Sequence, residues 1–153
     1  MERGIMWFTD LLPHLFTITL GSLVMFSCSV WLGIGYLVMS LLGVVWFWAT
    51  ICTRCRAYGS RACPSGYGRI SALLFPMRKG DFKRAFKRNI FSVALQWFVP
   101  LIVGIVCMFL HYSMVKVYLF TAFILVAFIY LPLASKGRGC SRCTQKGHCP
   151  WKK

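Results

Sequence analysis

Acidic side chains are scarce in this chain. Its 153 residues include three Asp and Glu against 18 Lys and Arg, and 58% of them are hydrophobic. An average soluble domain has about 25% charged residues, whereas only 14% of this chain is charged. The composition therefore argues against an ordinary soluble domain and is typical of a membrane protein.

Charged side chains are also missing from the interior of the long apolar runs. These runs cover roughly residues 15–51, 90–112 and 114–134. Pumps and ion-coupled carriers usually need ionisable groups within the membrane, so this absence argues against transport. A span needs about 20 apolar residues, and each of the last two runs therefore predicts one transmembrane helix.

The first run is too long for one span. It contains 37 residues, which at about 1.5 Å per residue would extend roughly 55 Å as a single helix. We therefore predict a hairpin that reverses at Gly33 and Gly35, because glycine adopts the backbone angles of tight turns. The fold class predicted is all-α, a polytopic membrane protein with four transmembrane helices arranged as two hairpins.

Basic residues supply an independent reason for four spans. Ten lie between Arg54 and Arg88, six lie from Lys136 to Lys153, and the other two are Arg3 and Lys116. Four spans place all of them except Lys116 on one side, as the positive-inside rule requires. We therefore predict a multi-pass protein of the cell (cytoplasmic) membrane with both termini cytoplasmic.

The net charge of +15 predicts attraction to anionic lipids at the cytoplasmic face. No binding fold or recognition motif for nucleic acid accompanies the charge, so nucleic acid is not an expected partner. The N-terminal stretch "MERGIMWFTDLLPHLF" has no basic n-region, and no A-x-A-like site follows it. The first span is therefore expected to be retained.

The stretch "GDFKRAFKRNIF" predicts an amphipathic helix that lies in the membrane interface, with Asp81 as its N-cap. Phe82, Ala85, Phe86 and Ile90 share one face of this helix, and four basic residues share the other. The alternative is a basic stop for the following span. The predicted organisation is 1–63, a hairpin with a cysteine triplet; 64–89, the basic amphipathic segment; and 90–153, a second hairpin with a second triplet.

Six of the eight cysteines form two matching triplets. Each reads C-[ST]-R-C, then five to seven residues, then C-P, and each follows an apolar run. The triplets are Cys52, Cys55 and Cys63, and Cys140, Cys143 and Cys149. Pro13 and Pro100 also align when the two halves are superimposed, so an internal duplication with parallel halves is predicted.

Reduced cysteines in C-x-x-C spacing are metal ligands or redox thiols, because a tight turn aims both sulfurs at one ion. Disulfides are not expected here because the cytoplasm keeps thiols reduced. Nearby arginines favour thiolate and offset the negative charge of a thiolate-bound metal. These are Arg54, Arg56, Arg61, Arg138 and Arg142. We predict that all six cysteines bind the metal or cofactor, with His148 as a further candidate ligand.

The stretch "CPSGYGRISALLF", together with the C-x-x-C pairs, resembles the integral-membrane polyferredoxin proteins of anaerobic respiration. The resemblance covers about 30 residues and implies an iron–sulfur cofactor. It also implies electron transfer at the membrane face with a redox partner protein or complex. The spacings before Cys63 and Cys149 are longer than in ferredoxins, and each triplet leaves a cubane cluster one ligand short. His148, a partner protein or a small ligand could fill that position, or four of the six cysteines could hold a single cluster.

Two alternatives remain beside the electron-transfer interpretation. In the first, Cys52, Cys55, Cys140 and Cys143 bind zinc and stabilise a membrane anchor or assembly subunit without a redox role. In the second, the C-x-x-C pairs exchange thiols and disulfides without a metal. The chain is predicted to be an electron-transfer or accessory subunit rather than a stand-alone enzyme, and no catalytic residue is assigned.

The remaining polar residues of the apolar runs predict structural roles. Cys28 and Cys107 do not align in the repeat and are expected to be small core residues. His14 and His111 are expected at opposite membrane faces, which argues against a haem held by both. Gln96 and the scattered Ser and Thr are expected to form hydrogen bonds between helices or back to the backbone.

Overall fold

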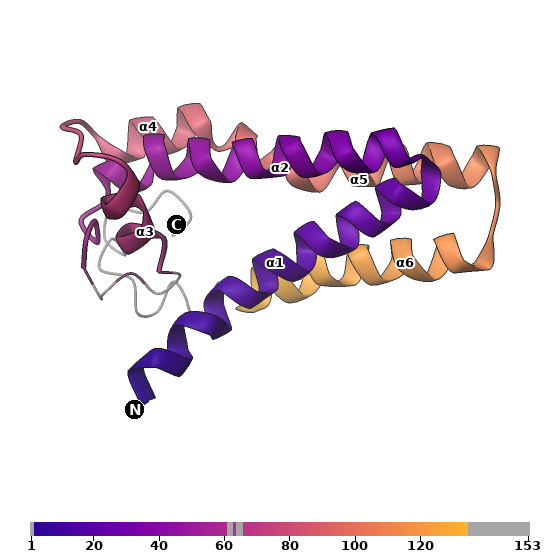
Figure 1. Ribbon diagram of the computed structural model, residues 1–153, viewed down its shortest axis with the longest axis horizontal. Helices are drawn as coiled ribbons and strands as arrows, with labels where there is room; N and C mark the ends of the chain where they lie inside the picture. The colour runs from indigo at the N-terminus through magenta and orange to yellow at the C-terminus, as the bar shows by residue number, and fades with distance from the viewer. Residues whose placement is uncertain (1, 61–62, 64–65, 135–153) are drawn as a thin grey trace.

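The computed structural model describes residues 2–60, 63 and 66–134, and residues 2–11 are described by their backbone alone. Within these residues every regular element is a helix. Figure 1 shows an elongated bundle of long helices with shorter helices gathered at one end. The long helices are α1 (Glu2–Cys28), α2 (Val30–Thr50), α5 (Phe91–Leu110) and α6 (Met114–Ile124). The short α-helices are α3 (Tyr67–Leu74), α4 (Phe82–Asn89) and α7 (Leu131–Ala134).

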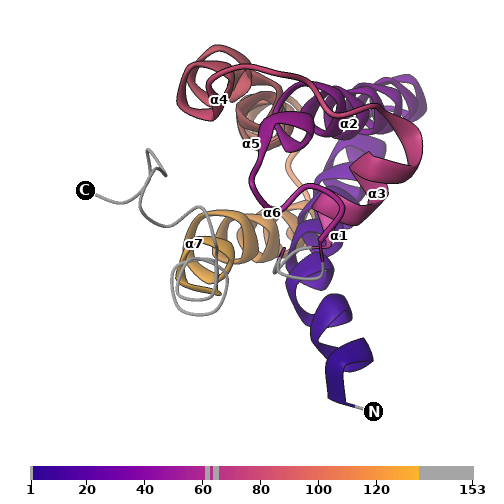
Figure 2. The ribbon, with the colours of Figure 1, turned by 90° about the vertical axis from the view of Figure 1, so that its left-hand side faces the viewer.

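The bundle consists of two helical hairpins that run in the same direction. The chain reverses between α1 and α2 and again between α5 and α6, and both reversals lie at the end of the bundle away from α3 and α4 (Figure 1). Helix α1 contacts α2, α5 and α6, and α2 also contacts α5. In the end-on view of Figure 2, α2 and α5 lie above α1 and α6.

The predicted position of the first reversal is wrong. The chain reverses at Ser29, whose φ of −162° and ψ of 144° are extended and separate α1 from α2. Gly33 instead lies inside α2, where the Phe26 ring of α1 occupies the place that a Cβ atom would take. The glycine therefore allows two helices to approach closely, which is the common use of small residues between membrane helices.

Within the described part of the chain, three helical stretches are long and apolar enough to cross a membrane, and one apolar helix is shorter. Large apolar side chains are exposed along them, including Trp31 (82% exposed) and Phe109 (87% exposed). This outward apolar surface fits the membrane protein that the composition predicts. The long stretches are Val30–Arg54, Phe82–Leu110 and Met114–Leu133, and the shorter one is Leu12–Cys28.

Gln96 and Tyr36 form polar contacts between the helices. Gln96 is 1% exposed, and its Nε2 donates a hydrogen bond to the carbonyl oxygen of Ser40 in α2 at 3.1 Å. The Tyr36 hydroxyl donates to the carbonyl oxygen of Gln96 at 2.8 Å. The predicted role of Gln96 between helices is confirmed.

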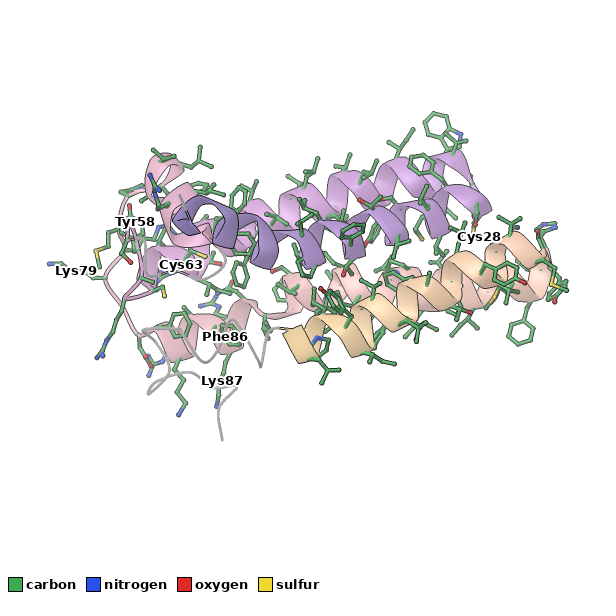
Figure 3. All side chains as sticks on the ribbon, turned by 90° about the horizontal axis from the view of Figure 1, so that it is seen from below. Cys28, Tyr58, Cys63, Lys79, Phe86 and Lys87 are labelled. Carbon is green, nitrogen blue, oxygen red and sulfur yellow. A yellow bond between two sulfur atoms is a disulfide. The ribbon has the colours of Figure 1, made fainter. Side chains whose placement is uncertain are left out.

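The amphipathic helix is confirmed as α4. Asp81 caps its N-terminus, because its Oδ1 accepts a hydrogen bond from the Lys83 amide at 3.0 Å. Ala85 is buried, whereas the side chain of Lys87 points away from the bundle (Figure 3). Helix α4 leads directly into α5 at Ile90.

The last apolar helix changes geometry along its length. Between α6 and α7 it contains a π-helical segment, η2 (Leu125–Tyr130). Pro132 follows this segment, and a proline in a helix lacks an N–H group and crowds the carbonyl four residues earlier. That carbonyl belongs to Phe128, so the irregular turns lie where the proline disfavours α-helical geometry.

Candidate functional site

The first C-x-x-C pair lies in a tight turn at the end of α2. A 3₁₀ helix, η1 (Cys52–Arg54), follows Ile51, and the Cys55 amide donates a hydrogen bond to the Cys52 carbonyl at 3.2 Å. Thr53 is fully buried, and its hydroxyl donates to the carbonyl of Ala49 at 2.9 Å. The turn is therefore tied directly to the last turn of α2.

Glycines close the loop that joins this turn to α3. Gly59 and Gly66 have φ values of 68° and 72°, a left-handed region that favours glycine. The Gly59 amide donates to the Gly68 carbonyl at 3.0 Å, and the Ala57 carbonyl oxygen occupies the place of a Cβ atom on Gly68. The loop thus folds back on itself, and no side chain larger than hydrogen fits at Gly68.

This closure brings the third cysteine of the triplet to the start of α3. The backbone amide of Gly68 donates a hydrogen bond to the sulfur of Cys63 at 3.4 Å. Hydrogen bonds to ligand sulfurs are one of the features that set the potential of iron–sulfur clusters. The loop therefore supplies an amide donor that a thiolate ligand can use.

Three hydrogen bonds dock α3 and the segment after it against α2 and the cysteine turn. The Ser71 hydroxyl donates to the Trp48 carbonyl at 3.0 Å. The Tyr58 hydroxyl donates to the Phe75 carbonyl at 2.6 Å, and the Arg78 amide donates to the Thr53 carbonyl at 3.1 Å. The cysteine turn is therefore bonded both to α2, through Thr53 and Ala49, and to the segment after α3, through Thr53 and Arg78.

Tyr67 is a site residue that the sequence analysis missed. Its ring contacts the rings of His14, Phe47 and Trp48, with centroid separations of 5.9–6.2 Å. Burial raises the pKa of Tyr67, and the neighbouring sulfurs of Cys52 and Cys63 raise this pKa further. Tyr67 is therefore a neutral aromatic group next to two of the predicted ligands. Its position shortly after the third cysteine, as the first residue of α3, was the available signal.

The predicted ligands are only partly described. Cys52 is buried, with 7% of its surface exposed, and Cys55 and Cys63 are half-buried at the same end of the bundle (Figure 3). The other predicted ligands lie outside the described residues; these are Cys140, Cys143, Cys149 and His148. Within the described part of the chain, no three Cys, His, Asp or Glu side chains form a group that could hold a metal ion. The full ligand set stays a prediction.

The expectation for Cys28 and Cys107 is wrong, because these two residues form a disulfide. Cys28 ends α1, and Cys107 lies in the last turn of α5, so the parallel hairpins place both near the reversals, with their Cα atoms 5.9 Å apart. Figure 3 shows Cys28 at the end of the bundle away from Cys63. The Nζ atom of Lys116 lies 3.7 Å from the Cys107 sulfur.

The two histidines are separated, as predicted. His14 contacts Tyr67 at the cysteine end, whereas His111 follows α5 at the reversal end.

Comparisons of the chain with protein-family models, curated proteins and solved structures gave no match.

Proposed function

We propose that this chain is a four-span membrane protein that carries a cysteine-ligated iron–sulfur centre at its basic end and exchanges electrons there with a partner protein. The observation that carries the proposal is the loop from Cys52 to Gly68. This loop joins a C-x-x-C turn, which is tied to the end of α2, to a third cysteine whose sulfur accepts a hydrogen bond from the Gly68 amide.

The second triplet follows the end of the last helix in the sequence. The chain of α6, η2 and α7 runs from the reversals towards the cysteine end (Figure 1). Six residues lead from Ala134 to Cys140, and fully extended they would cover about 20 Å. The proposal therefore draws ligands from both triplets, Cys52, Cys55 and Cys63 with Cys140, Cys143 and Cys149, and keeps His148 as a candidate. A bound cluster would supply one-electron chemistry.

Two features support an orientation with the cysteine end in the cytoplasm. Nine described basic residues lie between Arg54 and Arg88, at the end opposite the two reversals. The Cys28–Cys107 disulfide lies near the reversals, and disulfides persist in oxidising compartments outside the cytoplasm. The charge and the disulfide thus favour the same orientation by independent chemistry.

Helix length supports four spans. The apolar part of α1, Leu12–Cys28, is about 26 Å long at about 1.5 Å per residue, near the lower limit for crossing the hydrocarbon core. It runs antiparallel to α2 and contacts α2, α5 and α6. Pro13 and Pro100 occupy the first helix of each hairpin, which supports the proposed duplication.

The deciding experiment is anaerobic purification followed by metal and sulfide analysis. We expect a brown protein with iron and acid-labile sulfide in comparable amounts, whose colour bleaches when dithionite reduces it. Replacing Cys63 and Cys149 by Ser should lower both contents. The double variant Cys28→Ser/Cys107→Ser is the matched control, since it removes two cysteines at the other end and should leave both contents unchanged.

The same measurement separates the alternatives. Colourless protein with stoichiometric zinc, which tolerates loss of Cys63 and Cys149, would replace electron transfer by a zinc-stabilised anchor or assembly role. Colourless protein without metal, whose C-x-x-C thiols cycle between reduced and oxidised forms, would replace it by thiol–disulfide exchange.

A further inference from the structure

The two cysteines of the Cys28–Cys107 disulfide differ in their exposure to solvent. Cys107 is 7% exposed within the last turn of α5, whereas Cys28 is half-buried and directly precedes the reversal at Ser29. Thiol–disulfide exchange depends on which sulfur an incoming thiolate can reach and on how well the other sulfur leaves. Cys28 is the more exposed residue of the two, so attack at Cys28 makes Cys107 the leaving group.

Lys116 is placed to stabilise that leaving group. Both cysteines lie at the C-terminal ends of helices, where the helix dipole disfavours negative charge. The Lys116 ammonium, in the first turn of α6, lies 3.7 Å from the Cys107 sulfur and offsets this effect. A lysine in the first turn of a helix opposes the helix dipole, so its position is not explained by helix stability.

The surroundings of the pair strengthen this interaction. Val24, Gly104 and Phe120 pack closely there, with the Phe120 ring 2.7 Å from the place of a Cβ atom on Gly104. Val24 and Phe120 are both buried. An apolar environment with little water increases the attraction between an ammonium group and a thiolate.

We propose that the Cys28–Cys107 bond is an exchangeable disulfide that oxidises a dithiol on the side of the membrane where the chain reverses. A thiolate of the dithiol attacks the Cys28 sulfur, the bond between the two cysteines breaks, and its electron pair stays on Cys107 as a thiolate beside Lys116. The second thiol of the dithiol loses its proton and attacks the dithiol sulfur of this mixed disulfide, so that the bond to Cys28 breaks and Cys28 leaves as a thiolate that takes up a proton. The dithiol is thereby oxidised to a disulfide, and Cys28 and Cys107 are reduced to two thiols.

This proposal is independent of the metal centre. It uses residues only at the reversal end, and the dithiol is the reductant of one stoichiometric exchange. The test therefore uses the purified full chain in detergent micelles, with dithiothreitol as the dithiol. Alkylation at timed intervals, followed by mass spectrometry of the peptides that contain Cys28 and Cys107, gives the rate of reduction.

We expect the folded wild-type protein to lose the bond while its helical circular dichroism is unchanged. Lys116→Gln should slow reduction about threefold or more, because the leaving thiolate loses its cation, and Lys116→Arg should restore most of the rate. Lys79→Gln is the matched control, since Lys79 lies at the other end of the bundle (Figure 3) and should not affect the rate.

Single-cysteine variants test which sulfur is attacked. With oxidised glutathione, Cys107→Ser should acquire glutathione on Cys28, whereas Cys28→Ser should react at Cys107 about tenfold more slowly. Equal rates at the two cysteines would overturn the proposal. A wild-type rate in Lys116→Gln, or reduction only after unfolding, would overturn it as well, and the bond would then be a structural link between the hairpins.

Discussion

The backbone N–H of Gly68 donates to the sulfur of Cys63 over 3.4 Å, while the carbonyl oxygen of Ala57 lies where a side chain on Gly68 would begin. One glycine therefore closes the loop and supplies the donor to a cysteine proposed as a ligand. Loop closure and the proposed metal centre depend on the same residue, which makes it a useful position to change.

Gly68→Ala should displace the loop and reduce the bound iron. The added methyl group overlaps the Ala57 carbonyl, and such overpacking costs roughly 1–3 kcal/mol. Iron per protein chain after anaerobic purification is the measurement. Gly35→Ala is the control, because nothing lies within 4 Å of its added Cβ atom. Full iron content in Gly68→Ala would show that the loop does not position the ligands.

Tyr67→Phe should alter the alkaline stability of the protein. Burial, and then the sulfurs of Cys52 and Cys63, raise the pKa of Tyr67 above its ordinary value of 10.0, so above that pH the folded state keeps a proton that the unfolded state loses. Stability contributed by this proton is present below pH 10 and falls as pH rises, by at most about 1.4 kcal/mol per pH unit.

Thermal unfolding between pH 8 and pH 11 measures this contribution. The wild-type protein should lose stability more steeply above pH 10 than Tyr67→Phe. Tyr112→Phe is the control, because this ring is 69% exposed at the reversal between α5 and α6. Identical slopes in wild type and Tyr67→Phe would contradict the assigned environment of Tyr67.

Gln96→Leu should weaken the contact between α2 and α5. The change removes the hydrogen bond from Nε2 to the Ser40 carbonyl, and such bonds between membrane helices average about 0.6 kcal/mol. Unfolding by a denaturing detergent, followed by circular dichroism, gives the free energy. Leu95→Val is the control, since Leu95 is 42% exposed on the outer side of α5. A more stable Gln96→Leu variant would mean that its polar side chain serves something other than packing.

The helices were predictable because long apolar runs and the spacing of α4 depend on local sequence. The reversal at Ser29 was not predictable, because glycines occur both in turns and at close contacts between helices. Only the packing of Phe26 on Gly33 shows that this glycine belongs to a close contact. The Cys28–Cys107 bond was missed for a related reason. Its two residues are 79 positions apart and become neighbours only through the register of α1 against α5.

The candidate site was predictable in its residue types but not in its construction. The C-x-x-C spacing indicated a tight turn, and η1 is such a turn. The contribution of Tyr67 depends on α1 bringing His14 to its ring, which no local pattern encodes. The amide donor to Cys63 likewise depends on how the glycines close the loop.

The proposed orientation predicts a labelling pattern in intact cells. An impermeant maleimide added from outside should leave Cys63 and Cys149 unmodified, because both are proposed to face the cytoplasm. Cys28 should also stay unmodified until an impermeant reductant opens its bond with Cys107, and it should then react because it is half-buried at the reversal end. Permeabilised cells are the control, in which Cys63 becomes accessible. If Cys63 reacts from outside in intact cells, the cysteine end faces an oxidising compartment, and a reduced iron–sulfur centre there loses its chemical basis.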